Sequence, residues 1–246
     1  RSGNLVQRKY VEEFENSLCN YLNIKNAVVV SSGTAALHLA LLVLDIKKGD
    51  EVIVPAFTFP ATANVVELVG AKPVFVDITL DDFCIDTSKI EEKITSKTKA
   101  IIPVHEFGQS AKMDNIINIA KKYNLKIIED AACALGAEFE GKKVGTFGDM
   151  GCFSFHPRKA ITTGEGGVIV INNDKLAEKL RVLRNHGISY KDGIVDFVDA
   201  GFNYRMTDFQ AALGLMQLEE IEDIIEQRIG IANLYDDKLS STNKIK

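Results

Sequence analysis

The chain has 246 residues, of which 46% are hydrophobic and 26% are charged, so it is long enough to bury a sizeable core. Its formal net charge is −5, with 29 basic residues against 34 acidic ones and no long basic run. This balance argues against a protein that binds the phosphate backbone of nucleic acids, although a small anionic ligand could still be held locally.

Cysteine and histidine spacing excludes further classes. Four cysteines lie far apart without a C-x-x-C pair: Cys19, Cys84, Cys133 and Cys152. Since no signal peptide pattern precedes them, they predict reduced thiols in a cytoplasmic protein. No H-E-x-x-H pattern occurs, so no metal site is expected. Residues 27–44 carry no charge, but Ser31-Ser32-Gly33-Thr34 interrupts them, which favours a strand, a turn and a helix over a membrane span.

In chain order, short apolar segments rich in β-forming residues alternate with helical patterns. The predicted strands are 27–31, 51–55, 73–77, 100–104, 126–130, 151–155 and 167–171. The predicted helices are 34–44, 61–69, 114–123 and 175–185. This alternation predicts an α/β fold of three layers, α/β/α, in which helices cover both faces of a mostly parallel seven-stranded sheet.

A longer helical pattern follows near the end of the chain. It begins at Thr207-x-x-Gln210, which matches a capping box, and extends to residue 239. Its apolar positions are Phe209, Leu213, Met216, Leu218, Ile221, Ile225 and Ile229. The apolar stripe shifts after Met216, as expected for a helix that contacts one body first and another later. We therefore expect 207–239 to be a helix between two domains, with a helix at the edge of one domain as the alternative.

Ligands of open α/β sheets bind at the carboxyl ends of the strands, and the first candidate segment lies there. Ser31-Ser32-Gly33-Thr34-Ala35 follows a strand and opens a helix. Glycine lets the backbone approach an anion closely, and the free N–H groups of a helix start favour negative charge, so a phosphate would fit. The alternative is an ordinary turn between strand and helix, capped by Thr34.

Two further segments contain candidate chemical groups. Asp130 closes a strand, where its carboxylate could pair with a cationic group of a ligand or cap a helix. Lys159 follows the aromatic strand at 151–155 and precedes the glycine-rich stretch 162–167, where the backbone must pass close to another group. Most lysines are solvated surface charges, but a lysine amine held uncharged by its surroundings can bond covalently to a carbonyl compound.

Together these segments resemble the DegT/StrS-type nucleotide-sugar aminotransferases, a branch of the fold-type I enzymes that use pyridoxal 5′-phosphate (PLP). The similar blocks occur in family order through nearly the whole chain: SGTAAL (32–37), GDEVIVP (49–55), FTF (57–59), VFVD (74–77), EDAA (129–132), SFHPRK (154–159), TGEGG (163–167), RNHG (184–187) and NYRM (203–206). The resemblance implies that residues 1–246 are the PLP-binding large domain, without the N-terminal segment and the C-terminal small domain of the family.

The resemblance also implies two catalytic residues. Lys159 would bind the cofactor covalently and, once displaced by substrate, would be the base that moves a proton between carbons. Asp130 would face the pyridine nitrogen and keep it protonated, which makes the ring an electron sink. Where many relatives have glutamine three residues after this aspartate, the chain has Cys133, which puts the usual hydrogen bond to the cofactor's 3-hydroxyl in question.

The remaining candidate residues are implied to hold the cofactor. Gly33, Thr34 and Ala35 at the helix start, together with the Ser154 hydroxyl, would bind its phosphate. Phe59 would stack on its ring. Asn203 would reach the phosphate in the neighbouring subunit, which implies a homodimer with shared active sites. A second departure from the family is Arg8, which stands where glycine is usual.

The reaction implied by the resemblance moves an amino group from glutamate to a keto sugar on UDP, dTDP or GDP, for amino-sugar biosynthesis such as that of lipopolysaccharide O-antigen. The stretch 162–167 is more similar to members that act at C4 than at C3. Three alternatives remain: a PLP-dependent sugar dehydratase, in which histidine replaces the lysine; a truncated and inactive PLP-binding domain; and a dinucleotide-dependent dehydrogenase, although no G-x-G-x-x-G follows the first strand.

Overall fold

The centre of the fold, in a computed structural model that describes residues 5–191 and 193–242, is a seven-stranded sheet of order β1-β9-β8-β5-β4-β2-β3. Its strands are β1 (Asn26–Val30), β2 (Glu51–Pro55), β3 (Lys72–Val76), β4 (Thr98–Ile101), β5 (Lys126–Asp130), β8 (Met150–Ser154) and β9 (Gly167–Ile171). All pair in parallel except β9, which is antiparallel to both of its neighbours. The predicted mostly parallel, seven-stranded sheet is confirmed, and each predicted strand overlaps an observed one.

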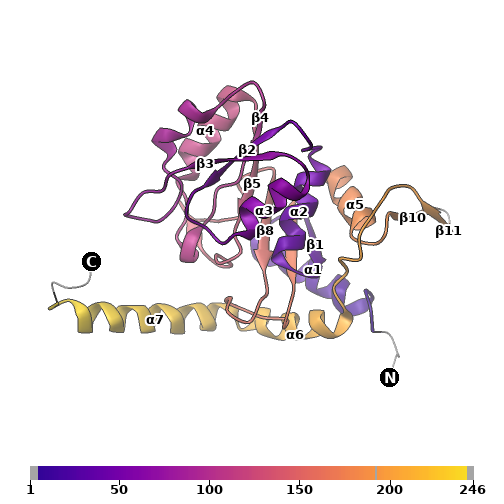
Figure 1. Cartoon of the computed structure of the whole chain (residues 1–246). Coiled ribbons are helices and arrows are strands. Elements are labelled where there is room, and N and C mark those ends of the chain that lie inside the picture. The colour runs from indigo at the N-terminus through magenta and orange to yellow at the C-terminus, as the bar shows by residue number, and fades with distance from the viewer. Residues whose placement is uncertain (1–4, 192, 243–246) are drawn as a thin grey trace.

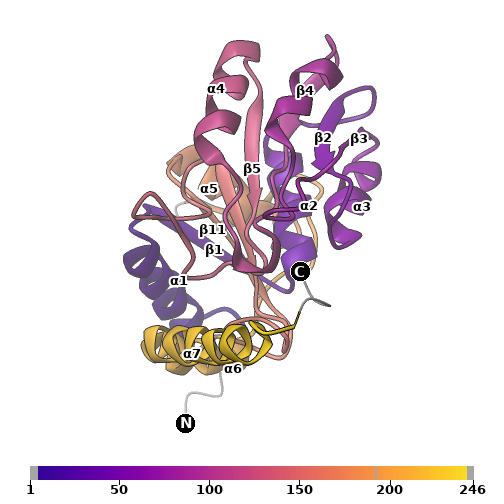
Figure 2. The ribbon, with the colours of Figure 1, turned by 90° about the vertical axis from the view of Figure 1, so that its left-hand side faces the viewer.

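Helices cover both faces of the sheet, as expected for three layers (Figure 2). On one face lie α2 (Gly33–Val43), α3 (Ala61–Leu68) and α5 (Asp174–Leu183). On the other face lie α1 (Lys9–Leu22), α4 (Met113–Tyr123) and α6 (Asp208–Glu219). The alternation of β1 decides which residues face which layer: Val28 and Val30 pack with α2, whereas Ala27 and Val29 pack with α1.

Several elements were not predicted from the sequence. Helix α1 packs on the sheet through Val11, Phe14, Leu18 and Leu22, which recur at helical spacing. The hairpin of β10 (Ile188–Lys191) and β11 (Ile194–Phe197) projects from the body (Figure 1). The remaining additions are the short pair β6 (Glu138–Phe139) and β7 (Lys142–Lys143) and 3-10 turns at 87–89, 91–93 and 106–108.

The structure corrects the expectation of one helix over 207–239. The capping box at Thr207 is present, but α6 ends at Glu219 and α7 (Ile221–Leu239) follows Glu220, whose φ and ψ are −103° and 10°. The two helices lie one after the other along the lower edge in Figure 1. Of the described α7 residues only Ile221 is fully buried, and most of the helix extends away from the body.

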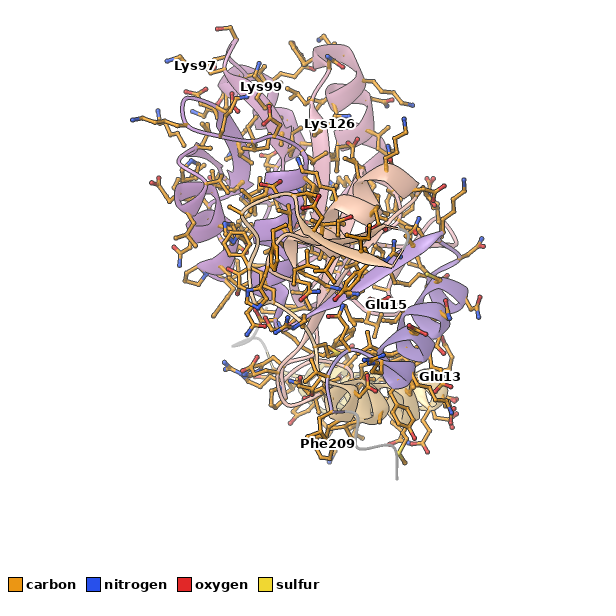
Figure 3. The ribbon with its side chains drawn as sticks, turned by 90° about the vertical axis from the view of Figure 1, so that its right-hand side faces the viewer. Glu13, Glu15, Lys97, Lys99, Lys126 and Phe209 are labelled. Carbon is orange, nitrogen blue, oxygen red and sulfur yellow. The ribbon has the colours of Figure 1, made fainter. Side chains whose placement is uncertain are left out.

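The first part of the predicted apolar stripe points in the opposite direction from the one expected. Phe209 and Met216 are 80% and 69% exposed, and Figure 3 shows Phe209 at the outer surface of α6. The body instead receives Ala211, Gly214 and Leu218. Helix α6 approaches α1 so closely that a Cβ on Gly214 would lie 2.6 Å from Phe14 Cζ. Small residues therefore face inward, and the large apolar ones remain outside.

Within the described residues, no helix combines the length and the apolar character needed to cross a bilayer.

Candidate active site

The carboxyl ends of β1, β5 and β8 bring the three candidate segments together. An added Cβ on Gly33 would lie 2.8 Å from Ser154 Cβ, so the start of α2 is in contact with the end of β8. An added Cβ on Gly167, in the glycine-rich stretch, would lie 2.5 Å from the carbonyl oxygen of Ser32. Only glycine fits at these two positions, because the two backbone segments and the Ser154 side chain meet there.

The start of α2 leaves backbone donors available for an anion. Ser32, and not Thr34, is the capping residue, because its Oγ accepts a hydrogen bond from the Ala35 amide at 3.0 Å. This bond occupies the Ala35 N–H, which the sequence had suggested for phosphate binding. The amides of Gly33 and Thr34 have no hydrogen-bond acceptor within the part of the chain that the structure describes. With Ser154 beside them, these two amides are available to donate hydrogen bonds to an anionic group.

Asp130 is buried at the end of β5, with 5% of its surface exposed. Its Oδ2 accepts a hydrogen bond from the Thr62 hydroxyl at 2.8 Å, and its Oδ1 accepts one from the Ala132 amide at 3.2 Å. Burial raises the pKa of the Asp130 carboxyl, while these two bonds and the charge of Lys159 act in the lowering direction. No helix follows Asp130, so it is not a helix cap, and its buried carboxylate is suited to a cationic partner.

Thr62, at the second position of α3, was not identified from the sequence. It is fully buried, and its hydroxyl lies 3.0 Å from that of Thr58 and 2.8 Å from Asp130 Oδ2. The two threonines therefore connect the loop after β2 to the acid at the end of β5. The signal that could have found them is the block Phe57-Thr58-Phe59, which contains Thr58 and ends three residues before Thr62.

We expect Thr62→Val to lower the free energy of unfolding by about 1–3 kcal/mol, because it leaves a buried carboxylate without one of its two donors. Thr58→Val is the matched control, since Thr58 does not contact Asp130, and it should cost less. Urea denaturation of both variants measures the difference. An equal loss of unfolding free energy in the two variants would show that the hydrogen bond to Asp130 does not stabilise the protein more than the bond between the two threonines.

Glu129, next to Asp130, is directed into the protein and not toward the candidate site. Its carboxylate accepts hydrogen bonds at 2.7 Å from the amides of Gly145, Phe147 and Gly148, which holds the loop between β7 and β8. It also accepts one from His105 Nε2 at 3.0 Å, where the bond from the Ala111 amide to Nδ1 assigns the proton to Nε2. Since every oxygen lone-pair direction is engaged inside the protein, Glu129 positions the loop and does not face the site.

Lys159 lies at the wall of a cavity of about 690 Å³. Its Nζ donates a hydrogen bond to Cys133 Sγ at 2.9 Å, and its carbonyl oxygen accepts one from Arg228 Nη2 at 3.1 Å. Phe107, Cys133, Arg158 and Arg228 line the same cavity. The lysine is only half-buried, so its amine can be reached by a ligand while it remains close to Asp130.

Glu106 is a second titratable group that the sequence did not reveal. It is 9% exposed and lies just after β4, near both Asp130 and Lys159. Burial, followed by the negative charge of Asp130, raises the pKa of Glu106, and the charge of Lys159 lowers it. Two acids and one lysine therefore share this edge of the sheet.

Phe59 and Asn203, the two other residues implied to bind the cofactor, are both exposed. Phe59 lies in the loop after β2 with 70% of its surface exposed, and its carbonyl oxygen accepts a hydrogen bond at 3.2 Å from the amide of Thr62, whose hydroxyl donates to Asp130. Asn203 is exposed and forms a β-bridge with Asn185, beside the end of β1, and no hydrogen bond joins it to Lys159 or Asp130 within the described residues. The remaining candidates, Gly33, Thr34, Ser154, Asp130, Cys133 and Lys159, are gathered at the ends of adjoining elements.

The assembled groups match one kind of ligand. A glycine cradle with free amides suits an anion, a buried carboxylate suits a protonated ring nitrogen, and a reachable lysine amine suits a carbonyl carbon. PLP carries these three features on one ring. No group of three or more metal-ligating side chains occurs in residues 5–191 and 193–242.

Known proteins share this architecture. Residues 1–246 match the model of the DegT/DnrJ/EryC1/StrS aminotransferase family. A GDP-perosamine synthase of Caulobacter vibrioides is 47% identical over 232 residues, covering 94% of this chain and 62% of the relative. The solved structure of PseC from Helicobacter pylori, an aminotransferase involved in the biosynthesis of pseudoaminic acid, gives a TM-score of 0.94 at 36% identity, covering 98% of this chain and 66% of PseC. The PLP-form of a putative sugar aminotransferase, Spr1654 of Streptococcus pneumoniae, gives a TM-score of 0.92 at 34% identity, covering 98% of this chain and 67% of Spr1654. The chain spans less than two thirds of the length of the first two relatives.

Proposed function

The chain belongs to the DegT/DnrJ/EryC1/StrS aminotransferase family, and from this premise we propose that it uses PLP to move an amino group from glutamate to a keto sugar carried on a nucleotide. The observation that carries the proposal is the position of Lys159, which lies at the wall of a cavity and whose charge acts to lower the pKa of the buried Asp130 carboxyl at the end of β5. The names of the Caulobacter and Helicobacter relatives, which both concern sugar amination, support the substrate class.

In this proposal each residue acts through a group that the structure positions. PLP, when bound, supplies an electron sink for the carbon that exchanges its amino group. The Asp130 carboxylate, oriented by Thr62 and the Ala132 amide, holds a proton on the ring nitrogen. The amides at the start of α2 and the Ser154 hydroxyl hold the phosphate. The Lys159 amine takes a proton from one carbon and returns it to another.

Cys133 gives the lysine a partner that glutamine would not provide in the same way. Its thiol accepts the hydrogen bond from Lys159 Nζ at 2.9 Å, so the bond orients the amine within the cavity that both residues line. Lysine in this place favours transamination over the sugar dehydration that a histidine would support, because only a primary amine can bind the cofactor covalently and release it again.

We also propose that two copies of the chain form a homodimer in which Asn203 of one copy serves the cofactor of the other. The support is its exposure and the absence of any hydrogen bond from it to this chain's own Lys159, within the described residues. Helix α7 carries Ile229, Ile231 and Leu234 with more than half of each side chain exposed, which supports a role as a connector to a further domain.

Shared sites make a specific prediction for mixed dimers. Lys159→Ala and Asn203→Ala should each reduce the activity of a homodimer strongly. When the two variants are dissociated and re-associated together, activity should recover to about a quarter of the unmodified level, because about half of the dimers are mixed and each mixed dimer has one intact site. The rate of transamination before and after mixing is the measurement. No recovery would place Asn203 in its own subunit's site, and a fully active Asn203→Ala homodimer would place it outside any site.

The function itself is tested by supplying the full-length protein with pyridoxamine phosphate and a panel of keto sugars linked to UDP, dTDP or GDP. Conversion of one of them to an amino sugar, with loss of the pyridoxamine absorbance, is the expected result. Regeneration by glutamate, with release of 2-oxoglutarate, tests the donor separately. Removal of a sugar hydroxyl without amination would identify a dehydratase, and cofactor binding without turnover on any sugar would identify an inactive domain.

A further inference from the structure

A second cavity, of about 530 Å³, lies between the start of α1, helix α5 and the segment that follows the β10–β11 hairpin. We call it the arginine cavity, after the four arginines in its wall: Arg8, Arg181, Arg184 and Arg205. Two carboxylates, those of Glu12 and Glu15, are also in the wall. It shares no lining residue with the cavity at Lys159, and none of its residues has a role in the proposed transamination.

One of the four guanidinium groups is fully engaged inside the protein. Arg184, 4% exposed, forms an ion pair with Glu15 and donates to the carbonyl oxygen of Val29 at 2.7 Å. Glu15 lies on the side of α1 that faces β1, where it also accepts a hydrogen bond from the Val29 amide at 3.0 Å (Figure 3). The side-chain oxygen of Gln7, turned toward Arg184, accepts from its Nη2 and Nε at 2.7 and 2.8 Å. This group belongs to the packing of α1 and cannot serve a ligand without losing its partners.

The guanidinium groups of Arg8 and Arg205 have donors without a partner within the described residues. Arg205 donates to Asn185 through Nη1, but its Nε is buried without a partner, and no other buried side-chain nitrogen or oxygen of the described residues is in that position. The Arg8 guanidinium has no hydrogen-bond or ion-pair partner within residues 5–191 and 193–242; only the backbone of Arg8 is bonded, with its amide donating to Asp208 and its carbonyl oxygen accepting from the Glu12 amide. Arg181 is engaged at both ends of its fork, because Nη1 lies 3.9 Å from a Glu178 carboxylate oxygen and Nη2 donates to Asn26 Oδ1 at 3.4 Å.

The balance of charge in the wall is therefore positive. Four arginines face two glutamates, and Glu15 is already paired with Arg184, which leaves Glu12 as the remaining lining carboxylate against three cations. This excess of guanidinium groups, together with the Arg8 guanidinium that has no partner within the described residues, points to an anion with several oxygens.

We propose that the arginine cavity binds a diphosphate group, held chiefly by Arg8 and Arg205. A guanidinium presents its N–H donors as a planar fork, and each phosphate offers three oxygens to more than one fork at once, whereas a carboxylate offers two oxygens in one plane.

The experiment is a calorimetric titration of inorganic pyrophosphate into the full-length protein loaded with PLP, so that the cofactor's own phosphate site is filled. Saturable binding of one pyrophosphate per chain is expected. Arg8→Gln should weaken it about tenfold, equivalent to about 1.4 kcal/mol, through the loss of a charge-assisted fork. Lys121→Gln, which removes the same charge from the exposed surface of α4, should leave the affinity unchanged.

Parallel titrations define the ligand and do not depend on transamination. If UDP binds more tightly than pyrophosphate and Arg8→Gln weakens its binding to the same extent, the ligand is a nucleoside diphosphate. If UDP and pyrophosphate bind with equal affinity, the site recognises the diphosphate alone. Arg205→Gln could disturb packing. Its pyrophosphate affinity is therefore interpreted only if the thermal unfolding temperature of the variant equals that of the unmodified protein. The proposal is overturned by an absence of saturable binding, by equal losses in Arg8→Gln and Lys121→Gln, or by tighter binding of 2-oxoglutarate than pyrophosphate that Arg8→Gln abolishes.

Discussion

Lys159→Ala is expected to abolish covalent capture of the cofactor and to remove nearly all transamination. Borohydride reduction of the PLP-loaded protein should fix the cofactor to the unmodified chain and leave the variant unlabelled, because the amine that bonds to the carbonyl carbon is gone. Steady-state turnover should fall by roughly 10²-fold to 10⁴-fold from the loss of positioned proton transfer alone. Peptide mapping of the reduced protein and assays of both half-reactions measure these effects.

The structure supplies a control for this result. Lys97 is exposed just before β4, so Lys97→Ala should leave both trapping and turnover as they are. Added methylamine should restore part of the rate to Lys159→Ala, since a small amine can occupy the space of the deleted side chain and carry the proton. Trapping that persists in Lys159→Ala would assign the cofactor to another lysine and would remove the central residue of the proposed function.

Asp130→Asn should separate activity from folding. The amide keeps the shape and can still accept the bond from Thr62, but it has no charge to hold a proton on the ring nitrogen. Turnover should fall by about 10²-fold to 10³-fold, the size seen when one preorganised electrostatic contact to a reacting group is lost. The stability of the cofactor-free variant should change little, because replacing a buried carboxylate by a neutral group offsets the loss of the acceptor that the Ala132 amide uses.

The pH dependence of stability provides the matched test. Burial raises the pKa of Asp130 above its ordinary 3.8, so between these two values the folded chain holds more protons than the unfolded chain. The contribution of this group to stability is therefore present below pH 3.8 and is lost as the pH rises through the folded pKa. The difference in unfolding free energy between Asp130→Asn and the unmodified cofactor-free protein should grow with pH in that window. A difference that does not change with pH, or a large destabilisation by Asn, would contradict the assignment.

Much of this molecule follows from local pattern. The apolar segments 51–55, 126–130 and 167–171 match observed strands residue for residue, because short runs of β-branched residues bounded by turns leave few other choices. Helix α1 was also within reach, since Val11, Phe14, Leu18 and Leu22 keep helical spacing. The order of motifs was sufficient to place Lys159, Asp130 and Gly33 at one edge, because parallel strands present their carboxyl ends together.

What the sequence determined by itself is the succession of strands and helices, the glycine positions that require close approach, and the family motifs, all of which depend on neighbours in the chain. Only the tertiary structure decided that Thr62 donates to Asp130, that Cys133 meets Lys159, that the large apolar residues of α6 face outward, and that Arg8 and Arg205 line one cavity. The physical reason is distance along the chain. Arg8 and Arg205 are nearly 200 residues apart, so their proximity results from the strand order and the packing of α1 against α6, which no local periodicity encodes.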